Sequence, residues 1–195
     1  MEIKDGIKSF YAKSTKEWRK WLEKNSQTEK SIWLIIYKKE SGVPSVYYSE
    51  AVDEALCFGW IDSKPNKRDD ESYYQFFAKR NPKSNWSKVN KAKVERLIEN
   101  GKMTQWGLEA IEIAKENGTW TALDTVEELE VPEDLQKAFN NSKKAFEYFD
   151  QFPRSSKRNI LEWILNAKKT ETRQKRIVET VALAEKNIKA NHFRQ

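Results

Sequence analysis

The decisive stretch of this sequence is IWLIIY, residues 32–37, a continuous apolar run of six residues. It is rich in β-branched and aromatic side chains, and it is too short and too aperiodic for a helix. A strand of this kind is typically buried on both faces of a sheet. Downstream, residues 60–69 and 72–80 predict two strands of a hairpin that turns at residues 69–71. Because the second of these strands carries aromatic residues on both faces, we expect it to be central.

The rest of the chain predicts helices. Ser14 and Glu17 form a capping box before a helix that ends near Asn25, and Ser49 is expected to cap a second helix that Gly59 ends. Further helices are expected over residues 86–100, 104–117, 132–139, 142–149, 155–165 (capped by Ser155 or Ser156) and 170–188, with residues 119–131 as an acidic linker.

These elements predict an α+β fold. We expect a small mixed sheet of about three strands, including one hairpin, with helices around it and an all-helical C-terminal half. The predicted domains are an α+β domain over residues 1–102 and a helical domain over residues 103–195 packed on it. A single continuous domain is the alternative.

The composition excludes several classes of protein. Of the 195 residues, 12 % are aromatic, which is too many for a disordered chain. One cysteine has no partner for a disulfide, and no apolar run is long enough for a membrane helix. Residues 1–10 hold no apolar stretch of the kind found in a secretory signal, so we expect a cytoplasmic protein.

The charge is unevenly distributed along the chain. Residues 64–93 hold nine basic and three acidic residues, and residues 154–195 hold eleven basic and four acidic ones. Between these two basic blocks, residues 94–153 hold six basic and thirteen acidic residues. Two interpretations stay open: the blocks neutralise one another in the fold, or they form a basic surface for an anionic partner.

Three sequence strings resemble one bacterial family. They are EALCFGWIDS at residues 54–63, SNWSKVNKAKVERLIENGKM at residues 84–103 and AKKTETRQKRI at residues 167–177. In this order they resemble the YdeI/OmpD-associated family, also labelled bacteriocin-protection proteins, over roughly residues 14–190. The resemblance implies a link to an outer-membrane porin and to resistance against cationic antimicrobial peptides. It implies no catalytic residues.

A candidate anion site lies where the sequence conflicts with helix electrostatics. First turns of helices normally favour acidic residues, yet residues 84–94 contain none. Backbone N–H groups and cations that converge at a helix start suit an anion. The predicted site comprises Lys79, Arg80, Lys83, Ser84, Trp86, Ser87 and Lys88. A secondary basic site is predicted at the last helix, formed by Lys168, Lys169, Arg173 and Arg176. Simple pairing with the acidic middle segment is the alternative for both.

Candidates for catalysis and for a metal are weak. An enzyme would have to use Asp62, Glu54 or Lys64 in a pocket between the sheet and the C-terminal helices, and no nucleophile–base pair or phosphate loop is present. The single His192 and the single Cys57 make no usual metal-ligand set, so no metal and no cofactor are expected. Cys57 is expected to be a buried apolar residue.

Nucleic acid is a further possible partner. Aromatic and basic residues alternate along residues 73–80, and such a strand could stack on bases. The strand lacks the glycine of the RNA-recognition consensus. The sequence therefore favours a binding protein with a basic surface for an anionic ligand or polyanion, linked to stress or envelope resistance. An enzyme acting on a small molecule and a nucleic-acid-binding protein are the alternatives.

Overall fold

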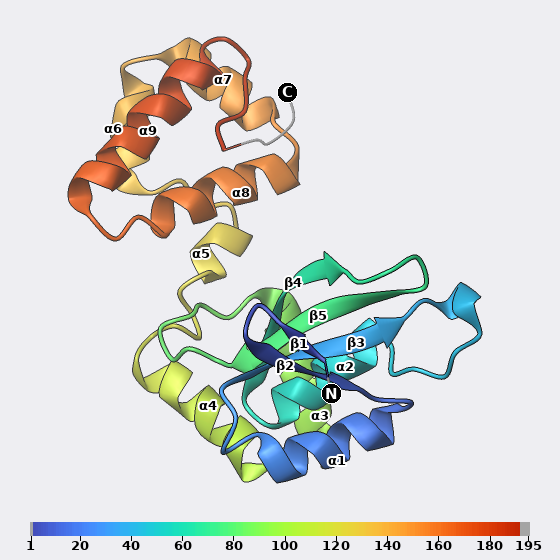
Figure 1. The fold of residues 1–195 in the computed structure, drawn as a ribbon. Helices are drawn as coiled ribbons and strands as arrows, with labels where there is room; N and C mark the ends of the chain where they lie inside the picture. Colours follow the sequence, from blue (N-terminus) through green and yellow to red (C-terminus); the bar gives the residue numbers. More distant parts are fainter. Residues whose placement is uncertain (1, 192–195) are drawn as a thin grey trace. The chain divides into compact units, whose positions relative to one another are not determined.

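The structure is a computed structural model that describes residues 2–191. The chain forms two compact units, Met1–Thr121 and Ala122–Gln195, which we call the first unit and the second unit. The first unit holds a sheet with helices, and the second unit is helical. The described chain is thus α+β with a helical C-terminal part, in agreement with the predicted fold class (Figure 1).

Within residues 2–191 the sheet has five strands in the order β1-β2-β3-β5-β4. Strand β2 pairs with β3 in parallel and the other neighbours are antiparallel, so the sheet is mixed as predicted. The central β3 is the IWLIIY stretch, and residues 32–36 are buried. The strands are β1 (Ile3–Lys4), β2 (Ile7–Tyr11), β3 (Ser31–Tyr37), β4 (Trp60–Lys67) and β5 (Ser72–Lys79).

The expected number of about three strands was wrong because the N-terminal hairpin was missed. Asp5 and Gly6 both have positive φ angles, 52° and 74°, and they join β1 to β2 by a two-residue turn. An Asp-Gly pair is the usual signal for this turn type. The strands beside it are short and interrupted by Lys and Ser, so their apolar pattern is weak.

Four α-helices of the first unit were predicted, and they form with shifted ends. They are α1 (Thr15–Asn25), α2 (Tyr48–Cys57), α3 (Lys88–Glu99) and α4 (Gln105–Glu116). Ser14 caps α1 as expected, because its side chain accepts a hydrogen bond from the backbone of Glu17. Ser49 is not a cap: Tyr47 holds that position, two residues earlier, and Glu50 accepts from its backbone N–H.

The main core of the first unit lies between one face of the sheet and the helices (Figure 1). Leu34 and Ile36 of β3 pack there with Trp18 and Leu22 of α1. The indole N–H of Trp18 donates to the carbonyl of Ala51 at 3.0 Å, which ties α1 to α2. Burial of these large apolar side chains supplies most of the stability of such a unit.

Helix α4 belongs to the first unit, although the sequence placed a boundary before it. Thr104 donates to the carbonyl of Cys57 through both its backbone N–H, at 3.1 Å, and its hydroxyl, at 2.6 Å. A Cβ atom at Gly107 would lie 2.4 Å from the same carbonyl oxygen. This close approach needs glycine and seats α4 on the end of α2. The compact unit therefore extends to Thr121.

The second unit has its own core, centred on Leu135, Phe139, Phe149 and Ile164. Ser142 caps α7 as predicted. Neither Ser155 nor Ser156 caps α8, which begins directly after Pro153. The helices are α5 (Asp124–Glu127), α6 (Glu133–Asn140), α7 (Lys143–Gln151), α8 (Arg154–Leu165) and α9 (Thr170–Ala184).

A helix that crosses a membrane has to be both long and apolar. Among residues 2–191 no helix is both long enough and apolar enough to cross a membrane.

Candidate functional site

The predicted anion site begins where β5 ends. Beyond Lys79 the backbone N–H of Arg80 donates to the carbonyl of Gly59 at 2.9 Å, so the sheet fixes the position of Arg80. The chain then turns at Asn81, whose side chain accepts from the backbone N–H of Lys83 at 2.9 Å. Asn side chains stabilise turns in this way. The segment 81–87 thus connects the sheet to the start of α3.

Arg80 is a largely buried arginine without an acidic partner. Its guanidinium lies 3.8 Å from the ring centre of Trp86, and Nη2 donates to the carbonyl of Asn85 at 2.6 Å. Its Nε is buried and has no hydrogen-bond partner. Burial lowers the pKa of Arg80 to about 10. Within residues 2–191 no carboxylate lies within ion-pair distance of this guanidinium.

Trp86 is the buried residue against which the guanidinium of Arg80 packs. It is only 2 % exposed, and its backbone N–H donates to the carbonyl of Thr119 at 3.1 Å. Its ring lies 5.1 Å from the ring of Trp120, and the ammonium of Lys115 lies 6.0 Å from Trp120. The two indoles meet at an interplanar angle of 49°, and together with nearby cations they form an electropositive support for Arg80.

The start of α3 completes the site. The side chain of Ser87 accepts from the backbone N–H of Asn90 at 3.3 Å and so caps the helix, whose first turn has no acidic residue. Lys83, Ser84 and Lys88 are exposed. Six of the seven predicted residues lie in residues 80–88, which run from the end of β5 to the start of α3. The side chain of the seventh, Lys79, donates instead to the carbonyl of Gln27 at 2.9 Å.

The secondary basic site has a different arrangement. Arg173 makes two hydrogen bonds to Asp134, at 2.6 and 2.9 Å, and a third to the carbonyl of Ile164. Arg176 donates to the carbonyl of Trp163 and lies 4.9 Å from its ring. Their guanidinium groups are thus held by the second unit itself. The other two predicted residues, Lys168 and Lys169, are exposed.

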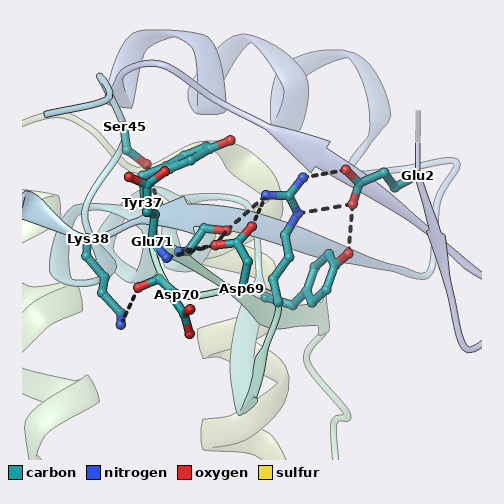
Figure 2. Close-up of polar contacts among 10 residues, drawn as sticks. Glu2, Tyr37, Lys38, Ser45, Asp69, Asp70 and Glu71 are labelled. Atoms are coloured by element: carbon teal, nitrogen blue, oxygen red, sulfur yellow. Dashed lines mark hydrogen bonds and ion pairs between the residues drawn. The ribbon is translucent and has the colours of Figure 1, made fainter. Parts of the chain in front are cut away.

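Three further cations of the first basic block pair with acidic residues. Arg68 binds Glu2 through two hydrogen bonds, at 2.6 and 3.2 Å, and also binds Asp69 (Figure 2). Hydrogen bonds from Arg68 and Tyr74 lower the pKa of Glu2 to about 2. The other two pairs are Lys67 with Asp70 and Lys93 with Asp53. Sequence spacing gave no signal for the Arg68–Glu2 pair, because 66 residues separate the two.

Two of the three catalytic candidates have partners of their own, and the third is exposed. The hydroxyl of Tyr48 donates to Asp62 at 2.7 Å. Glu54 is 6 % exposed and pairs with Arg19 at 2.7 Å. Lys64 is exposed, at the irregular step of β4. Among the described residues no hydrogen bond or ion pair joins any two of the three candidates.

Cys57 is buried, as expected. Burial is the main reason that its pKa is raised to about 11, so the thiol stays protonated near neutral pH. Across residues 2–191 no group of three or more His, Cys, Asp or Glu residues could hold a metal ion. His192 lies outside the described residues.

The aromatic residues of β5 already have contacts inside the protein. Tyr73 and Phe77 contribute to the main core, and Tyr74 donates a hydrogen bond to Glu2. The ammonium of Lys4 lies 5.4 Å from the ring of Tyr74 and 5.7 Å from the ring of Trp33. A base stacked on Tyr74 would have to share that ring with Lys4.

Comparisons with known families divide the chain in two. Residues 10–110 match the model of a domain of unknown function, DUF8412. Residues 128–187 match the model described as bacteriocin-protection, YdeI or OmpD-associated. The family resemblance seen in the sequence is therefore confirmed over residues 128–187, which include the third string. The first two strings lie in the other match. No curated protein and no solved structure matches the chain.

Proposed function

The chain belongs to the family of the domain of unknown function DUF8412, and from this starting point we propose that its first unit binds an anionic ligand beside Arg80. The second unit carries the bacteriocin-protection, YdeI or OmpD-associated domain. In this proposal the protein is a binding protein, and the site is formed by Arg80, Trp86 and the segment that leads into α3.

The observation that carries this proposal is the uncompensated charge of Arg80. Taking a charged group out of water is costly unless a counter-charge and hydrogen bonds replace the lost hydration. Among the described residues the guanidinium has one acceptor, the carbonyl of Asn85, and no acid. A bound anion would supply the missing negative charge and so recover part of the cost of burial.

The geometry suits an oxyanion. A guanidinium presents its N–H groups in a plane and binds two oxygens of a carboxylate, sulfate or phosphate at once. Stacking on Trp86 fixes the plane of the Arg80 guanidinium, and Nη1 has no acceptor among the described residues. Lys83, within the loop, and Lys88, at the start of α3, add positive charge, and neither makes an ion pair among residues 2–191.

Phosphate-dependent stabilisation tests the proposal. A ligand that binds only the folded state at one hundred times its Kd stabilises it by about 2.7 kcal/mol. We expect inorganic phosphate to raise the free energy of unfolding of the first unit. Arg80→Met should weaken phosphate binding about tenfold or more, because a charge-assisted hydrogen-bond pair is lost. Arg80→Lys should retain part of the binding.

The matched control is Lys20→Met, which removes an exposed cation of α1. We expect this variant to bind phosphate like the unaltered chain. Equal stabilisation by phosphate in Arg80→Met and Lys20→Met would refute the site. Polyphosphate and a single-stranded RNA of equal charge, compared over a salt series, then separate a small-anion site from a polyanion or nucleic-acid site.

For the cellular role we propose protection of bacteria against cationic peptides, supported by the family matched over residues 128–187. Cells that produce the chain should survive a cationic antimicrobial peptide better than cells that lack it. If anion binding is the means of protection, cells with the Arg80→Met variant should resemble cells that lack the chain. Full protection by that variant would separate the cellular role from the anion site.

A further inference from the structure

A second site lies in the first unit, at the end of β3 and the start of α2. A hollow of about 390 Å³ is open to solvent there. Tyrosine is the most frequent residue of its lining, to which the chain contributes four of its seven tyrosines. The lining residues that matter here are Tyr37, Tyr47, Tyr48, Tyr73 and Lys39, and we call the hollow the tyrosine pocket.

The rings of the tyrosine pocket are held in place yet accessible. Tyr47 is 37 % exposed and Tyr48 is 47 % exposed. The hydroxyl of Tyr48 donates to Asp62 at 2.7 Å, which fixes the position of the phenol. The ring of Tyr37 meets that of Tyr11 edge to face at 5.2 Å. Exposed aromatic rings that are already ordered lose little conformational entropy when a ligand binds.

The phenol of Tyr48 is also a stable neutral group. Burial, together with the hydrogen bond to Asp62, raises the pKa of Tyr48 to about 12. The Asp62 carboxylate is engaged with that hydroxyl and does not line the pocket. The wall therefore offers apolar ring surface rather than charge near Tyr48.

A cation, Lys39, also lines the tyrosine pocket. Lys39, in the short 3₁₀ helix η1 (Lys39–Ser41), places its ammonium 5.1 Å from the ring centre of Tyr47. This ammonium makes no ion pair within residues 2–191, whereas the neighbouring Lys38 donates to the carbonyl of Asp70. Glu40 is the acidic residue of the lining.

From this arrangement we infer that the tyrosine pocket binds a small aromatic carboxylate. The aromatic ring of the ligand would pack against the 47 % exposed ring of Tyr48, because contacts between aromatic rings are favourable. Its carboxylate would form a charge-assisted hydrogen bond with Lys39. The pocket thus requires a flat apolar body and one negative charge in the same small molecule.

The charges argue against the other ligand that an aromatic wall suits, a quaternary ammonium ion. Such cages draw their affinity from the negative faces of the rings. Here Lys39 already lies over Tyr47, and it would repel a second cation. The positive end of α2, which begins at Tyr48, adds to this repulsion.

Titration of the full chain with benzoate, followed by NMR, tests the inference. Benzoate should shift the resonances of the pocket tyrosines and of Lys39. Two probes test the ring and the charge of benzoate separately. Benzyl alcohol has the ring without the charge, and acetate has the charge without the ring. We expect benzoate to bind at least about fivefold more tightly than either one, as for a surface charge pair added to ring stacking.

Variants assign the binding to this pocket. Lys39→Met should weaken benzoate about fivefold and leave benzyl alcohol unchanged. Tyr48→Ala should weaken both ligands about tenfold. Trp106→Ala is the matched control, since it removes a 44 % exposed aromatic side chain of α4 that does not line the pocket. Thermal melts confirm that each variant is folded.

The inference is overturned if benzoate binds no better than benzyl alcohol, or if Lys39→Met binds benzoate as well as the unaltered chain does. Equal loss in Trp106→Ala would also overturn it. Arg80→Met should leave the benzoate-induced shifts of the pocket tyrosines intact, because Arg80 does not line the pocket. Failure of this inference and failure of the phosphate site are therefore distinguishable.

Discussion

Two stretches of this chain share an excess of basic residues but differ in the partners that the fold gives them. Residues 79–88 and residues 168–176 both place lysines and arginines at the start of a helix. In the second unit the carboxylate of Asp134 accepts two hydrogen bonds from Arg173. In the first unit Arg80 has a tryptophan ring and a carbonyl as partners and no acid. The first stretch therefore keeps a largely buried charge that a ligand could neutralise, whereas the charge of Arg173 is already neutralised by Asp134.

The difference shows what a charge pattern leaves undetermined. Asp134 lies 39 residues before Arg173 and reaches it only because α6 and α9 belong to the same helical unit. The sequence contains the acid and the base but not their distance. Whether a basic cluster is internal charge balance or a binding surface is decided by tertiary packing, and two substitutions can measure it.

The largest effect is expected from Arg173→Met. The variant removes a paired guanidinium, with its two hydrogen bonds to Asp134 and its hydrogen bond to the carbonyl of Ile164. Breaking such a half-exposed, bidentate pair should lower the free energy of unfolding of the second unit by about 1–2 kcal/mol. Hydrogen exchange of the core amides of α8 and α9 would report this loss separately from the first unit. Lys169→Met, at an exposed position, is the control.

Arg80→Met should give the opposite result in the absence of ligand. The variant removes a buried charge that has no counter-ion, and it keeps an apolar side chain against Trp86. The lost hydrogen bond to Asn85 and the gained burial nearly cancel, so we expect a change of about 1 kcal/mol or less, in the direction of greater stability. Urea unfolding in phosphate-free buffer measures it. A large loss would show that Arg80 is a structural residue and would remove the contrast with Arg173.

Local features of the fold could be predicted from the sequence. The buried strand β3, the cap at Ser14 and the turn glycine at Gly59 follow from residues that are neighbours in the chain. The hairpin of β1 and β2 was missed, because its short strands gain stability from pairing with β3 rather than from their own pattern. The position of α4 could not be foreseen, since it depends on the contact of Gly107 with the end of α2.

The candidate site was predictable to the same extent. Arg80 and Trp86 come together within one short loop, because they are six positions apart in the chain. The acid that holds Arg68 and the carboxylate that holds Tyr48 lie far away in sequence, so their roles had no signal. The charge pattern of the sequence therefore predicted the basic loop. Tertiary packing determines which cations of the loop have an acidic partner among the described residues.

The smallest effect is expected from Glu2→Gln, which tests the difference between two arginines of the first unit. Arg68 has an acidic partner, Glu2, whereas Arg80 has none among the described residues. The folded-state pKa of Glu2 is lowered from 4.5 to about 2, so its pairing stabilises the first unit above about pH 4.5 and is lost as the pH falls toward 2. Glu2→Gln removes this titration, and the stability of the variant should depend less on pH across that window. Solvent screens this half-exposed pair, so the effect should be smaller than that of Arg173→Met. Urea midpoints at pH 5 and pH 2.5 provide the measurement. Identical pH profiles for Glu2→Gln and the unaltered chain would show that the network of Figure 2 contributes nothing measurable, and the contrast would then rest on Arg173 alone.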